Sequence, residues 1–136
     1  MSEPLIKIKP LKYTKGLVDA EALTDLSSKV EEQGQIVIHV IYPPQSEPYA
    51  IRVWKSTFLF SKNSDHRTKL IHAENISLSP QWTEVSDCQP YAFTLFFEAF
   101  PKNVLVFDLV EIIPQPGGFN YHGILRNYTD VYTISL

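Results

Sequence analysis

The sequence predicts a mostly-β fold: an antiparallel two-layer β-sandwich of about eight short strands, with one short helix or helical turn near the N-terminus. Three observations predict it. Short apolar segments recur along the chain and are rich in Val, Ile, Thr and aromatic residues, which fit the pleated surface of a sheet. Ten Pro and five Gly divide the chain between these segments. The segments do not alternate with helical patterns, so a parallel sheet with crossover helices is not expected.

The first 34 residues are expected to contribute one strand and one helix. Residues 5–9 alternate between apolar and basic side chains and end at Pro10, which is typical of a strand. Apolar residues between positions 18 and 30 have helical spacing, and Gly34 follows as a terminator. The alternative for this stretch is a loop with one helical turn. We expect residues 1–34 to pack on the sandwich, so that all 136 residues form a single domain.

The remaining strands follow a period of two residues. We expect them at residues 35–42, 51–60, 70–78, 91–100, 104–113, 119–125 and 131–136. Residues 35–42 are nearly all apolar, which favours a central strand. Residues 104–113 follow a proline turn and are expected to form a hairpin with residues 91–100. Pro80 and Trp82 follow residues 70–78, and a polar loop is then expected through Pro90.

Composition and charge exclude several classes of protein. Lys and Arg number 12 against 15 Asp and Glu, which gives a net charge of −3, and no basic stripe is present. A nucleic-acid partner is therefore not expected. No segment has the length and apolar character of a membrane span, so no membrane insertion is expected, and the N-terminus lacks the apolar run of a signal peptide. The expected location is the cytoplasm if Met1 is the native start; otherwise the location is open.

Catalytic patterns in the sequence are weak. Cys88 is the only cysteine and lies in a polar stretch beside Asp87, which disfavours a thiolate. Residues 64–66, Ser-Asp-His, contain the three residue types of a catalytic triad. Consecutive loop residues point apart, however, so this segment is interpreted as a turn. We expect no catalytic residues.

Metal-binding and acidic patterns are also incomplete. His72 and Glu74 are two apart on an expected strand and can share a face, but a zinc site needs three or four ligands. Asp108 and Glu111 have opposite strand parity and are expected on opposite faces. Glu98 lies within an apolar strand. Either it faces solvent or it is buried in an ion pair, for which the candidate partners are Arg52, Lys55 and Arg126. No metal site and no cofactor are expected.

Aromatic residues are the most abundant candidates for a binding surface. Most of them, including Trp54, are expected in the core, because a sandwich interior needs large side chains. The core is also the expectation for Trp82, but its position near a loop keeps it a candidate for the surface. The loop tyrosines are expected to be more exposed. The candidate interaction surface consists of Tyr49, Trp82, Tyr121 and Tyr128.

Three stretches resemble an uncharacterised group of small bacterial β-sandwich domains with an immunoglobulin-like layout. They are residues 51–59 (IRVWKSTFL), residues 93–111 (FTLFFEAFPKNVLVFDLVE) and residues 126–132 (RNYTDVY). In this group a strand of the form F-T-L-x-F precedes a proline turn and a D-x-x-E strand. The resemblance spans about residues 35–136 and implies the fold. It implies no activity.

Three functional hypotheses remain. The leading one is a noncatalytic interaction module that binds another protein or its own copy, because edge strands can pair with a second chain. The alternative is a module that binds carbohydrate or another small ligand through surface aromatics. It requires two or more coplanar exposed aromatic rings in a groove, and burial of both Trp54 and Trp82 would remove its main support. The third is an enzyme, which requires His72, Glu74 or Glu98 in a deep cleft beside a second titratable group.

Overall fold

The computed structural model describes residues 34–136, and these residues form strands, turns and loops without a helix. The nine strands are β1 (Gln35–Tyr42), β2 (Tyr49–Ile51), β3 (Thr57–Ser61), β4 (Arg67–Glu74), β5 (Thr83–Val85), β6 (Tyr91–Glu98), β7 (Val106–Glu111), β8 (Asn120–Leu125) and β9 (Val131–Ser135). The mostly-β prediction is confirmed. The strand expected at residues 5–9 and the helix expected between residues 18 and 30, with their packing on the sheet, lie outside the described residues.

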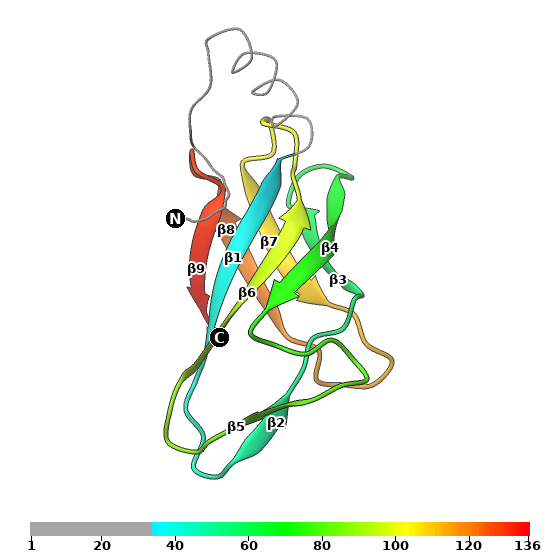
Figure 1. Cartoon of the computed structure of the whole chain (residues 1–136). Coiled ribbons are helices and arrows are strands. Elements are labelled where there is room, and N and C mark those ends of the chain that lie inside the picture. The colour runs from blue at the N-terminus through cyan, green and yellow to red at the C-terminus, as the bar shows by residue number, and fades with distance from the viewer. Residues whose placement is uncertain (1–33) are drawn as a thin grey trace, which may run out of the picture. The chain divides into compact units, whose positions relative to one another are not determined.

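Seven strands form one hydrogen-bonded sheet in the order β8-β7-β3-β4-β6-β1-β9. All neighbours are antiparallel except β1 and β9, which are parallel. The sheet curls until it is nearly a barrel, and it is not clearly divided into two layers (Figure 1). Consecutive strands β8 and β9 are its two edges, and no hydrogen-bonded pairing joins them. β2 and β5 form a separate antiparallel ribbon at the end of the sheet where β1 and β9 finish (Figure 1).

The core fills the inside of this curved sheet. Alternate residues of β1, β6, β7 and β9 are buried, because successive side chains of a strand point to opposite faces. The fully buried side chains include Ile36, Ile38, Leu59, Leu95, Phe97, Phe107 and Leu109. Each contributes roughly 1.5–3 kcal/mol by leaving water. Burial in these strands therefore follows the period of two that the sequence predicted.

The predicted strand at residues 51–60 is wrong as a single element. It divides into β2 and β3, and Val53 between them makes an isolated bridge to Leu78. The hydroxyl of Thr57, which is buried, donates to the carbonyl of Trp54 at 2.6 Å and closes the turn that ends the bridge. The polar loop expected between Trp82 and Pro90 was also wrong in part, since this segment contains β5.

The predicted hairpin between residues 91–100 and 104–113 is wrong. β6 lies between β4 and β1 and has no free edge, whereas β7 pairs with β3 and β8. The chain therefore crosses from one part of the sheet to another between these strands. The turn is closed by a hydrogen bond from the N–H of Val104 to the carbonyl of Pro101 at 3.1 Å.

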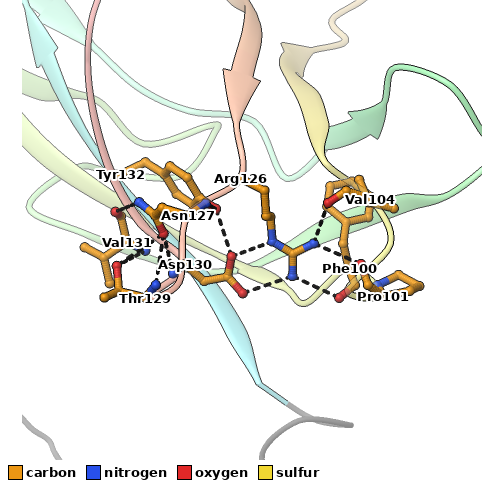
Figure 2. Close-up of polar contacts among 9 residues, drawn as sticks. All are labelled: Phe100, Pro101, Val104, Arg126, Asn127, Thr129, Asp130, Val131 and Tyr132. Atoms are coloured by element: carbon orange, nitrogen blue, oxygen red, sulfur yellow. Dashed lines mark hydrogen bonds and ion pairs between the residues drawn. The ribbon is translucent and has the colours of Figure 1, made fainter.

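Arg126 fixes this crossover turn to the connection between β8 and β9 (Figure 2). Its guanidinium donates to both carboxylate oxygens of Asp130, at 2.6 and 3.0 Å, and to three backbone carbonyls, which belong to Phe100, Pro101 and Val104. These five hydrogen bonds use every N–H of the guanidinium. Two connections far apart in sequence are thus held together by one side chain, which we call the Arg126 corner.

Tyr132 completes the Arg126 corner (Figure 2). Its hydroxyl donates to Asp130 at 2.8 Å and accepts from the backbone N–H of Asn127 at 3.1 Å. Burial raises the pKa of Tyr132 to about 12, and the hydrogen bond and charge of Asp130 act in the same direction. The carbonyl of Asp130 accepts from the N–H of Val37 at 2.9 Å. The corner therefore sets the point at which β1 and β9 begin to run side by side.

Candidate functional site

A pocket of about 280 Å³ lies at the opposite end of β1 and β9 from the Arg126 corner. Tyr42 at the end of β1 and Leu136 after β9 contribute to its lining. Its volume is close to the lower limit of pockets that bind small molecules. The lining combines aromatic rings with two charged side chains, and its members are Tyr42, Ala50, Ile51, Arg52, Trp54, Trp82, Phe93, Glu111, Ile113, Gln115, Pro116, Gly117, Phe119 and Leu136.

Arg52 lies over both tryptophan rings of this pocket. Its guanidinium carbon is 3.9 Å from the ring centroid of Trp82 and 5.4 Å from that of Trp54. Both distances are within the range of a cation–π interaction. Nη1 of Arg52 donates to the carbonyl of Pro80 at 3.1 Å. The guanidinium is thus oriented by stacking and by one hydrogen bond.

The backbone brings these three residues together. Ile51 pairs with Thr83 across the β2–β5 ribbon, so the next residue of one strand and the preceding residue of the other are close neighbours. These neighbours are Arg52 and Trp82. On the other side of Arg52, the N–H of Val53 donates to the carbonyl of Ser77, and its carbonyl accepts from the N–H of Ser79. Backbone pairing at Ile51 and at Val53 therefore fixes the chain on both sides of Arg52. The arrangement therefore depends on pairing between segments about thirty positions apart in the sequence.

Glu111 is the one acidic side chain in the described lining of the pocket, and only 8% of its surface is exposed. Oε2 accepts from the backbone N–H of Trp54 at 3.0 Å, and Oε1 accepts from that of Phe119 at 3.3 Å. Burial raises the pKa of Glu111 above its usual value, although these two hydrogen bonds and the charge of Arg52 act in the opposite direction. The carboxyl group joins the segment that carries Trp54 to the loop before β8.

That loop fits closely against β7. Gly117 has a φ of +107°, a backbone conformation that residues with a Cβ rarely adopt. A Cβ at Gly118 would collide with the backbone oxygen of Glu111. The two glycines thus allow the loop to approach Glu111 and to present Gln115 and Pro116 at the pocket.

The four residues of the predicted interaction surface lie in separate places. Trp82 is 55% exposed at the pocket, and Tyr128 is fully exposed in the connection between β8 and β9. Tyr49 in β2 and Tyr121 in β8 are half-buried. The hydroxyl of Tyr49 is buried without a hydrogen-bond partner in the described part of the chain. Trp82 is the one member that lines the pocket.

Sequence reasoning assigned Trp54 to the core and did not select Arg52 for a binding site. Trp54 is only partly buried, because the strand expected at residues 51–60 breaks on either side of Val53. Trp54 follows the buried Val53 in an extended segment, so their side chains point to opposite faces, and this alternation in the sequence indicates that Trp54 lies away from the core. No local sequence pattern indicates that Arg52 and Trp82 are neighbours.

The other candidate residues occupy exposed positions. His72 and Glu74 share a face of β4 as expected, with Nε2 and Oε2 3.4 Å apart, and both are more than half exposed. Glu98 faces solvent and is not buried in an ion pair, while Arg52 and Arg126 have the other partners described above. None of His72, Glu74 and Glu98 lines the pocket described above.

The remaining polar candidates have local structural contacts. Asp108 and Glu111 face opposite sides of β7, as their parity predicted. Asp108 accepts from the N–H of Gly123 at 2.8 Å and pairs with His122 at 3.1 Å and Lys62 at 3.4 Å. Burial alone would raise the pKa of Asp108, but these contacts outweigh burial and lower it.

Cys88 and residues 64–66 lie in loops. Cys88 is exposed, and its N–H donates to the carbonyl of Gln45. Residues 64–66 form part of the turn between β3 and β4, as predicted. Within residues 34–136, no group of three or more His, Cys, Asp or Glu residues is arranged to hold a metal ion.

Comparison with known proteins adds no relative. No protein-family model, no curated protein and no solved structure matches the chain. Across the part that the structure describes, no helix has the length and apolar character needed to cross a membrane.

Proposed function

We propose that this protein is a noncatalytic binding module that takes carbohydrate in the pocket formed by Arg52, Trp54, Trp82 and Glu111. The observation that carries the proposal is the stack of Arg52 over two tryptophan rings at the mouth of a pocket. Sugars present flat apolar faces that pack on aromatic rings, together with hydroxyls that need oriented polar groups. Trp82 supplies exposed ring surface, and Arg52 and Gln115 supply polar groups.

The pocket also suits a small ligand by its construction. Its polar groups are oriented before a ligand arrives, since Arg52 is held by Pro80 and by stacking, and Glu111 by two backbone N–H groups. Such preorganisation reduces the entropy lost on binding. The mixture of apolar rings with a few fixed polar groups is typical of small-molecule sites.

Tryptophan fluorescence offers a direct test. The chain has two tryptophans, and both line the pocket, so emission from the full-length protein reports on this site alone. We expect a saturable change in emission when a matching mono- or oligosaccharide is titrated, with calorimetry giving the same Kd. Trp82→Ala should abolish binding measured by calorimetry. Tyr128→Ala, which removes an exposed ring far from the pocket, is the matched control and should bind normally.

Two results would contradict the proposal. The first is the absence of any spectral or calorimetric response across a broad panel of neutral, amino and acidic sugars. The second is a Trp82→Ala variant that folds normally and binds the sugar as tightly as the unmodified protein does.

A second candidate function is the interaction module favoured by the sequence. In residues 34–136 no strand pairs with the outer edges of β8 and β9, and Leu125, Tyr128 and Val131 near these edges are exposed. Unpaired edges can accept a strand from another protein or from a second copy. Light scattering on the purified protein and affinity capture from its host test this function. A monomer with nothing bound would count against it.

The kinship with bacterial immunoglobulin-like domains, and with it the two-layer sandwich, stays a proposal. Its support is the hydroxyl of Tyr132, which accepts from the backbone N–H five residues upstream, at Asn127. This contact is similar to the tyrosine corner of Greek-key sandwiches. An experimental structure of the full chain would test the relationship through the order and layering of the strands.

A further inference from the structure

We infer that the sugar bound in this pocket is an acidic one whose carboxylate pairs with the guanidinium of Arg52. The inference rests on the proposed function and adds the chemical class of the ligand to it. Three features of the site carry it: the uncommitted donors of Arg52, the commitment of both oxygens of Glu111, and the charges that line the pocket.

Arg52 retains donors that a ligand can use. A guanidinium has five N–H groups in a planar fork. Among the described residues, its only acceptor is the carbonyl of Pro80, which bonds to Nη1. The other N–H groups are therefore available at the mouth of the pocket. A planar carboxylate is the ligand group that matches this fork by forming two parallel hydrogen bonds.

Stacking increases the value of this arginine as an anion receptor. The rings of Trp82 and Trp54 lie at 3.9 and 5.4 Å from the guanidinium and shield its face from water. The orientation of the fork is therefore restricted before a ligand binds, and less side-chain entropy is lost on binding. A lysine at this position would supply a point charge without the plane or the fork.

Glu111 does not neutralise Arg52 by direct contact. Each of its two carboxylate oxygens accepts from a backbone N–H, and no ion pair joins the two side chains. Arg52 is the only basic side chain among the described residues that line the pocket. A ligand carboxylate would therefore find one cation with unused donors, and the uronic acids carry such a group on a sugar ring.

The test compares sugars that differ in one group. Glucuronic and galacturonic acids, their methyl esters and the corresponding neutral sugars are titrated into the full-length protein, with tryptophan fluorescence and calorimetry as readouts. We expect an acid to bind at least about tenfold more tightly than its methyl ester, which has the same ring but no charge. Affinity for the acid should fall as salt is raised, while affinity for the ester should not.

Variants of Arg52 complete the test. Arg52→Gln should bind the acid and its ester with equal affinity, and Arg52→Lys should recover only part of the preference for the acid. If acid and ester bind equally to the unmodified protein, the inference is wrong while the proposed function stands. If the preference survives in Arg52→Gln, the inference is also wrong. If the acids and their esters do not bind but a neutral or amino sugar does, the inference is wrong and the proposed function stands. If no sugar binds, the inference and the proposed function are both wrong.

Discussion

Arg52 and Arg126 lie near opposite ends of β1 and β9, and their guanidinium groups differ in how many hydrogen bonds they make. Arg126 donates all its N–H groups to Asp130 and to three backbone carbonyls. Arg52 makes one hydrogen bond and otherwise stacks on tryptophan rings. The first side chain is largely buried and joins two connections of the fold. The second lines a pocket and has donors left over.

The number of N–H groups that have no acceptor inside the protein distinguishes a structural arginine from a candidate binding arginine. A guanidinium whose N–H groups are all used inside the protein cannot bind a ligand without breaking those hydrogen bonds. A guanidinium held mainly by stacking can donate to a ligand and keep its hydrogen bonds inside the protein. Substitutions at the two arginines should therefore have opposite effects on stability and on binding.

The largest expected effect is that of Arg126→Gln on stability. The change removes five hydrogen bonds in a partly buried setting, three to backbone carbonyls and two to the carboxylate of Asp130. We expect a loss of about 3 kcal/mol in the free energy of unfolding, measured by urea denaturation. Arg67→Gln is the control, because Arg67 is exposed and only lies over the ring of Phe58, and it should cost less than about 1 kcal/mol. Equal losses in the two variants would contradict the role of the Arg126 corner.

Tyr132→Phe should have the next largest effect. It removes the acceptor of the Asn127 N–H and the donor to Asp130, and we expect a loss of about 1–2 kcal/mol. Tyr128→Phe is the control and should leave stability unchanged, because Tyr128 is fully exposed. A loss in Tyr128→Phe equal to that in Tyr132→Phe would show that the hydroxyl of Tyr132 has no special role.

The same tyrosine predicts a dependence on alkaline pH. The folded pKa of Tyr132 is raised to about 12 from an ordinary value of 10.0, so its folded form holds the proton more tightly than the unfolded form does. Its contribution is complete below pH 10 and is lost as pH rises through about 12. The difference in stability between the unmodified protein and Tyr132→Phe should shrink over this range in urea titrations. A constant difference would contradict the assigned contacts.

The sequence predicted the strand-rich fold but not the site. A period of two is a local property, so the strands were visible in the sequence, but the nearly all-apolar segments that form β1 and β6 did not show which residues are internal. The order of strands was not local. Residues 104–113 looked like the hairpin partner of residues 91–100, but both edges of β6 are occupied by β4 and β1.

Charged residues show the same division. Asp130 follows Arg126 by four positions, and this spacing was visible in the sequence, yet Arg126 was considered as a partner of Glu98. Three of the bonds of Arg126 go to backbone carbonyls, which carry no residue-specific pattern. The neighbourhood of Arg52 and Trp82 depends on the register of the β2–β5 ribbon, and β5 was not predicted at all.

Glu111, at the pocket, should change the free energy of unfolding with pH, and by less than the substitutions at the Arg126 corner do. Its folded pKa is raised mainly by burial, so the folded state holds this proton more tightly than the unfolded state does. Relative to Glu111→Gln, the unmodified protein should be most stable below the ordinary pKa of 4.5 and should lose stability as pH rises through the folded value. The size of the loss is about 1.4 kcal/mol for each unit of pKa difference. Urea titrations of both proteins from pH 4 to 7 measure it, and a gain on the unmodified side as pH rises would contradict the assignment.

The smallest expected effect on stability is that of Arg52→Gln. One hydrogen bond to Pro80 and two stacking contacts are lost at a solvent-accessible mouth, so the free energy of unfolding should fall by less than about 1 kcal/mol. The same substitution at Arg126 should cost several times more. Urea denaturation of the two variants side by side makes the comparison with one type of side-chain change. If Arg52→Gln destabilised the protein as much as Arg126→Gln does, Arg52 would be a structural residue, and its spare N–H groups would no longer distinguish the two ends of the sheet.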